Sequence, residues 1–166
     1  IRDRGEGMPI TDRNRKLAFL QPDLILSVHG NADETGEASG FECYPAVPGM
    51  ENHEASMEFA ALLAEEMEAA GSELRGGNGI RFGYYVNGQK MLVDSTDTTV
   101  YDYDTFGVLK NQEGAAVLVE QCFVTNESDV AQFGTEEGCQ KAAEAYYRAI
   151  LRYLGAEETT KNQSEP

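Results

Sequence analysis

The sequence is poor in several residue types: its 166 residues include no tryptophan, two histidines, three cysteines, and 13 basic side chains against 29 acidic ones. The resulting net charge of −16 would repel phosphate backbones, and no basic cluster offsets it, which argues against nucleic acid as a partner. No stretch approaches the roughly 18 consecutive apolar residues of a membrane span. The hydrophobic content of 41% is ordinary for a globular domain.

The scarcity of cysteine narrows the choice of structure further. Cys43, Cys122 and Cys139 are odd in number and contain no close pair, so neither a disulfide framework nor a Cys-rich zinc site is indicated. We expect free, buried thiols instead. Cysteine usage does not determine the cellular compartment.

What the sequence does contain is an alternation of helix and strand patterns. Helical spacing of apolar residues marks residues 12–20, 54–70 and 135–154, and short apolar runs typical of strands mark residues 24–28, 41–44 and 115–119. Asn87-Gly88 indicates a hairpin turn. This alternation predicts a single α/β domain over residues 1–155, with a mixed twisted sheet and helices on both faces. A polar tail follows at residues 156–166.

Two of the predicted strands end on a chemically capable side chain. Val28 is followed by His29, and Val119 is followed by Glu120. In open α/β sheets the ligand crevice lies at the carboxyl ends of the strands, so both groups are candidates for one site. Taken alone, His29 could be a hydrogen-bonded structural residue and Glu120 a solvated one. Gly30, directly after His29, suggests a close backbone approach to some other group.

Three segments carry a family resemblance. Residues 22–32 read PDLILSVHGNA, residues 40–44 read GFECY, and residues 116–126 read AVLVEQCFVTN. They resemble, in the same order, the ADLFISIHANA, GFEVYY and PAVLVExGFlSN motifs of zinc-dependent N-acetylmuramoyl-L-alanine amidases, which are bacterial cell-wall hydrolases. The resemblance extends from Ile1 to about residue 154, and Ile1-Arg2-Asp3 resembles the end of the family's TRD strand.

This resemblance implies a mechanism and a setting. In the family, zinc is held by two His and one Glu and keeps a position open for water, and a separate Glu moves the proton to the leaving amine. His29 would be the second His ligand, and Glu120 the catalytic acid/base. The implied partners are the stem peptide and muramic acid of peptidoglycan, whose connecting amide bond is cut. The implied location is extracellular or in the cell wall.

The resemblance also predicts an incomplete metal site. The family's first His and its Glu ligand precede the TRD strand, in a segment that these 166 residues do not contain. His53 is the only other histidine, does not match the missing ligand, and is interpreted as a surface residue. We therefore expect no complete zinc site at His29, and a gap or intermolecular pairing where the preceding strand belongs.

Two alternatives remain at this stage. The chain could be a wall-binding or regulatory module on a degenerate amidase fold, which would need no zinc. It could also be a metal-free glycosidase that pairs Glu120 with a second carboxylate. The reaction products distinguish the amidase from the glycosidase hypothesis, because an amidase releases stem peptides whereas a glycosidase cuts the glycan.

Overall fold

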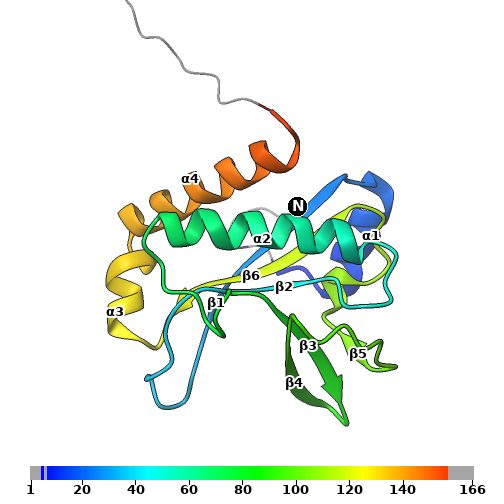
Figure 1. The fold of residues 1–166 in the computed structure, drawn as a ribbon, viewed down its shortest axis with the longest axis horizontal. Coiled ribbons are helices and arrows are strands. Elements are labelled where there is room, and N and C mark those ends of the chain that lie inside the picture. The colour runs from blue at the N-terminus through cyan, green and yellow to red at the C-terminus, as the bar shows by residue number, and fades with distance from the viewer. Residues whose placement is uncertain (1–4, 6, 157–166) are drawn as a thin grey trace, which may run out of the picture.

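A computed structural model describes residue 5 and residues 7–156 of the chain (Figure 1). Its strands are β1 (Leu24–Asn31), β2 (Glu42–Pro45), β3 (Arg81–Val86), β4 (Gln89–Asp94), β5 (Asp104–Thr105) and β6 (Ala115–Phe123). Its helices are α1 (Ile10–Leu20), α2 (His53–Ala69), α3 (Glu127–Asp129) and α4 (Glu136–Tyr153), with a 3-10 turn η1 (Gly107–Leu109) and a π-helical turn η2 (Val130–Gly134). The TRD-like start and all of the predicted tail except Ala156 lie outside the described residues.

The central sheet is built around β6. It runs parallel to β1 on one side and antiparallel to β2 on the other, which confirms the predicted mixed sheet. The first five residues of β6 are all buried, because apolar layers cover both of its faces. A second sheet, in the order β4-β3-β5, lies beside the central one.

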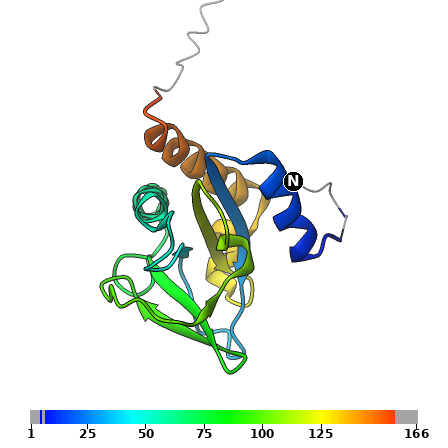
Figure 2. The same ribbon diagram turned by 90° about the vertical axis from the view of Figure 1, so that its right-hand side faces the viewer.

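Helices cover both faces of the central sheet, as predicted for an α/β domain (Figure 2). On one face α2 and α4 pack against alternate residues of β6, namely Ala115, Val117 and Val119. On the other face α1 and η1 contribute Leu17, Val108 and Leu109, which pack against the intervening residues Ala116 and Leu118. None of the described helices is both long and apolar enough to cross a membrane.

Local sequence signals locate two of the elements well. The Thr135 side chain accepts a hydrogen bond from the Gly138 amide at 3.1 Å and caps the start of α4. Asn87 and Gly88 both have positive φ, at 52° and 79°, as a two-residue hairpin turn between β3 and β4 requires. Cys43 and Cys122 are free and buried, as expected. Cys139, in α4, is free but exposed, so the expectation of a buried thiol is wrong at this position.

The two edges of the central sheet differ in cover. All four residues of β2 are buried, and Phe41 and Cys43 form parallel bridges with Leu74 and Ile80, respectively. The outer edge of β1 has no strand partner within the described part of the chain. A groove of about 610 Å³ runs between this edge and α1, with His29 at one end.

Candidate active site

Three polar side chains lie side by side at one level of the central sheet. His29 in β1 pairs in register with Glu120 in β6, and Glu120 pairs in register with Glu42 in β2. Partners in neighbouring strands lie about 5 Å apart and share a face of the sheet. The three residues therefore form a row, called here the acid row. It lies on the α1 face, because Leu118 and Tyr44, each two residues away, pack on that face.

Both residues predicted from the sequence belong to this row, but their position in the strands differs from the prediction. His29 and Glu120 lie inside β1 and β6, which continue to Asn31 and Phe123, rather than just beyond the strand ends. Strand pairing continues past the last apolar residue because the backbone of β6 still has partners on both sides. The register shifts after His29 and Glu120, because Asn31 pairs with Phe123 and β6 therefore carries one extra residue opposite β1.

Gly30 lies on β1 opposite this irregular part of β6 and permits a close approach. A Cβ atom added at Gly30 would lie 2.7 Å from Cγ1 of Val124. The sequence suggests a close approach of the backbone at this glycine, and the group approached is the segment that follows β6. Gly30 therefore brings the end of β1 against the end of β6, next to the acid row.

Glu120 has an oxygen that no described group uses. The residue is half-buried, and its Oε2 atom is buried without a hydrogen-bond partner. Burial raises the pKa of Glu120, the positive charge of Lys90 opposes this shift, and the negative charge of Glu42 adds to it. A carboxyl group with a raised pKa and an uncommitted oxygen is suited to accept a proton and pass it on.

His29 lies at the open edge of the sheet. Its Nε2 atom is 3.0 Å from Oγ of Ser27, two residues earlier on the same face. Partial desolvation of the ring by neighbouring atoms, together with the charge of Arg13, lowers the pKa of His29. A lower pKa favours the neutral imidazole, which is the form that binds metals.

The described residues do not assemble a metal site around His29. They contain no group of three or more His, Cys, Asp or Glu side chains that could hold a metal ion. Catalytic zinc normally uses three protein ligands. His29 is therefore a single candidate ligand, and the described residues alone do not fit a zinc ion.

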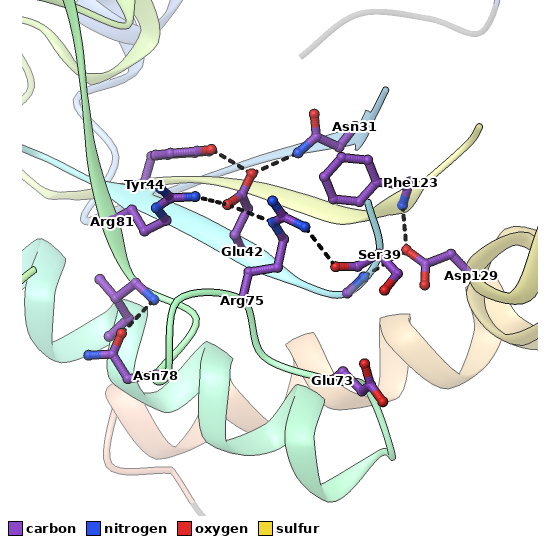
Figure 3. A network of polar contacts seen from close by, with 12 residues as sticks. Asn31, Ser39, Glu42, Tyr44, Glu73, Arg75, Asn78, Arg81, Phe123 and Asp129 are labelled. Carbon is purple, nitrogen blue, oxygen red and sulfur yellow. Dashed lines mark hydrogen bonds and ion pairs between the residues drawn. The ribbon is translucent and has the colours of Figure 1, made fainter. Parts of the chain in front are cut away.

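In Glu42, by contrast, both carboxylate oxygens accept hydrogen bonds (Figure 3). Its Oε1 accepts hydrogen bonds from Asn31 Nδ2 and the Tyr44 hydroxyl, both at 2.7 Å, and its Oε2 accepts from Arg75 at 3.3 Å and Arg81 at 3.1 Å. Burial raises the pKa of Glu42, but the hydrogen bonds from Tyr44 and Arg81 and the charges of Arg75 and Arg81 outweigh it, so the net shift is downward. Glu42 is an ionised structural clamp that ties the end of β1 to β2.

Sequence reasoning missed this clamp. In the sequence, Glu42 was considered only as part of the GFECY motif. A Glu within a short strand of buried type nevertheless indicates a paired carboxylate. A buried carboxylate needs cationic or hydrogen-bonding partners. Those partners, Arg75 and Arg81, are 33 and 39 residues further along the chain.

His53 does not join the acid row. It begins α2, where its Nδ1 atom lies 2.7 Å from the carbonyl oxygen of Ala46 and its ring centroid 5.6 Å from that of Phe82. The residue is half-buried. The interpretation of His53 as a surface residue is therefore wrong: its imidazole links the start of α2 to the segment after β2.

The fold and the acid row define an α/β domain that carries a polar site on one face of a mixed sheet. Residues 1–152 match the family model described as N-acetylmuramoyl-L-alanine amidase. The chain therefore belongs to this amidase family. The family assignment agrees with the resemblance carried by the segments around His29 and Glu120.

Two individual proteins are similar to this chain in sequence. The chain is 27% identical over 146 residues to N-acetylmuramoyl-L-alanine amidase LytC of Bacillus subtilis (strain 168), covering 87% of this chain and 24% of LytC. It is 30% identical over 149 residues to the uncharacterized protein YqiI of the same organism, covering 88% of this chain and 58% of YqiI. The chain thus spans about a quarter of the length of LytC and somewhat over half of the length of YqiI.

A solved structure supports the fold. The catalytic domain of CwlV, an N-acetylmuramoyl-L-alanine amidase from Bacillus (Paenibacillus) polymyxa var. colistinus, superposes with a TM-score of 0.69 at 21% identity. The match covers 94% of this chain and 71% of that chain. At this level of identity the similarity establishes a shared fold.

Proposed function

We propose that this chain carries the acid/base, Glu120, and one zinc ligand, His29, of a peptidoglycan hydrolase that cleaves the amide bond between N-acetylmuramic acid and L-alanine. The observation that carries this proposal is the buried, unpartnered Oε2 of Glu120, in register beside an imidazole. Its neighbour Glu42 shows how this fold fully pairs a carboxylate that has a structural role. Membership of the amidase family supports the reaction class.

In this proposal Glu120 accepts a proton from the attacking water and delivers it to the amine of L-alanine as the amide bond breaks. Its raised pKa lets the carboxyl group hold that proton between the two transfers. His29 would be one of the groups that hold zinc. As a Lewis acid, the bound metal would polarise the amide carbonyl. The amide bond is replaced by a carboxylate on the lactyl group and a free amine on the stem peptide.

The other zinc ligands are proposed to come from polypeptide outside the described residues. The open edge of β1 can pair with one more strand, and the groove along it has apolar walls that include Leu17, Leu20 and Val108. A strand placed there would run next to His29 and could bring further ligands to it. On this proposal residues 1–155 form most of the catalytic domain, and the complete protein acts in the cell wall or outside the cell.

Two other functions fit the arrangement of the acid row less well than amide hydrolysis does. A glycosidase would need a second free carboxylate, but the nearest, Glu42, is buried and held by two arginines. An inactive wall-binding module is the second candidate, because the described residues provide only one imidazole beside Glu120. Such a module would have no use for an uncommitted carboxylate oxygen.

The test is Glu120→Gln in the complete zinc-loaded protein. Hydrolysis of purified peptidoglycan should fall by about 10²-fold or more, the usual size of a general acid–base contribution. Zinc content should stay unchanged, because Glu120 is not proposed as a ligand. Glu68→Gln is the matched control, since Glu68 is an exposed carboxylate on α2, which packs on the opposite face of the sheet. Near wild-type turnover in Glu120→Gln would refute the assignment.

A further inference from the structure

The hairpin formed by β3 and β4 brings a lysine to the face that carries the acid row. The Nζ atom of Lys90 lies 4.6 Å from the ring centroid of Tyr44 and 5.3 Å from that of Phe106, and it donates a hydrogen bond to the Tyr44 hydroxyl at 3.4 Å. The two rings are themselves in contact, with centroids 5.1 Å apart. Lys90 thus rests on a two-ring platform that fixes the position of its ammonium group.

This platform is joined directly to the acid row. Tyr44, which supports Lys90, donates its own hydroxyl hydrogen to Glu42, the register partner of Glu120. Tyr44 and Phe106 both belong to the apolar cluster on the α1 face. The ammonium group is therefore held above the same face of the sheet as His29 and Glu120.

Lys90 lacks an acidic partner, unlike several other cations among the described residues. Lys110 pairs with Asp104, and Arg75 and Arg81 both pair with Glu42. Among the described residues, Lys90 forms no ion pair, although the chain has a net charge of −16. An exposed ammonium held in place on two rings, with donors to spare, is suited to bind an anion that is not part of this chain.

We propose that Lys90 is a specificity-determining residue that binds a carboxylate of the stem peptide close to the scissile amide, so that the site prefers acidic stem peptides to amidated ones. This inference rests on the proposed function. The platform already restricts the lysine side chain, so less conformational entropy is lost on binding. In an acidic protein, such a local cation also guides an anionic substrate to the acid row.

A different role for Lys90 would leave a different signature. Its charge also acts on Glu120, so its removal could alter the acid/base directly. That effect would be the same for every substrate and would shift the pH profile of turnover. Binding of a substrate carboxylate would depend on whether that carboxylate is present.

The experiment compares two muramyl peptides that differ in one group. In one, the second stem residue has a free carboxylate, and in the other this group is a carboxamide. For Lys90→Met in the complete protein, we expect kcat/KM for the acidic peptide to fall by about tenfold, as for loss of one charge-assisted hydrogen bond, and for the amide to change by less than about twofold. Lys90→Arg should retain most of the preference. Lys141→Met is the matched control, because Lys141 also lies over a ring, Phe133, but on α4.

Equal losses on both peptides, or no loss on either, would overturn the role of Lys90. Equilibrium binding of the two peptides, measured by titration calorimetry, separates this failure from failure of the proposed function. If wild-type protein cleaves neither peptide but binds the acidic one more tightly, and Lys90→Met removes that difference, the amidase proposal fails and Lys90 keeps its role. If wild-type protein binds both peptides equally, the proposed role of Lys90 is wrong.

Discussion

The two edges of the central sheet show where this domain separates stability from chemistry. At the β2 edge every strand residue is buried, and the Glu42 carboxylate is paired on both of its oxygens. At the β1 edge the backbone lacks a further strand among the described residues, and Val28 is 52% exposed. Glu120 stands between them with one oxygen uncommitted. The acid row thus runs from a closed edge to an open one, and its chemistry is expected on the open side.

The largest effect on stability should follow from Phe41→Ala, at the start of the closed edge. Phe41 is fully buried in the cluster under α2 and α4, so its removal leaves a cavity that the surroundings fill only in part. The free energy of unfolding should fall by about 3–5 kcal/mol in a denaturant titration. Val28→Ala, at the open edge, is the control and should cost less than about 1 kcal/mol. Similar losses for both variants would show that the two edges do not differ as described.

A smaller effect is expected from Glu42→Gln. The change leaves Arg75 and Arg81 without their counter-charge; because both side chains are about a quarter exposed, at 29% and 26%, water replaces part of the interaction. We expect a loss of about 2 kcal/mol in the free energy of unfolding, less than for a fully buried pair. A loss near zero would mean that the clamp does not stabilise the closed edge.

The pH dependence of stability should report on the same clamp. The folded-state pKa of Glu42 lies below its ordinary value of 4.5, so the unfolded chain takes up this proton first as the pH falls. The contribution of Glu42 is therefore complete above pH 4.5 and declines as the pH drops towards the folded pKa. Unfolding free energies of wild type and Glu42→Gln should converge in that acidic range. A difference that stays constant there would contradict the assignment.

The smallest effect on stability is expected from His29→Ala at the open edge. His29 is exposed, so in metal-free protein the free energy of unfolding should change by no more than about 0.5 kcal/mol. Zinc content of the complete protein, measured by atomic absorption, should fall together with activity, because the site would lose a ligand. Undiminished zinc in this variant would make His29 a structural residue.

The sequence allowed the helices and strands to be predicted because their signals are local. Apolar spacing located α2 and α4 to within about two residues, and turn or cap residues such as Thr135 and Asn87 marked their neighbours. His29 and Glu120 were predicted from strand position and family resemblance. Their assigned roles stay predictions that the variants above can test.

What could not be predicted depends on contacts between distant parts of the chain. The pairing of Glu42 with Glu120 joins strands nearly eighty residues apart, and no periodicity encodes that register. The position of Lys90 over Tyr44 depends likewise on how the hairpin packs against the central sheet. Strand ends were placed too early at His29 and Glu120, because polar residues hide the backbone pairing that continues beyond them.

The central claim is that the acid row serves amide hydrolysis in the cell wall. It is tested most directly by digesting purified peptidoglycan with the complete zinc-loaded protein and identifying the products by mass spectrometry. Release of stem peptides with a free L-alanine amino terminus, from glycan strands that stay uncut, is the expected result. Glycan fragments with new reducing ends and stem peptides still attached would contradict the claim.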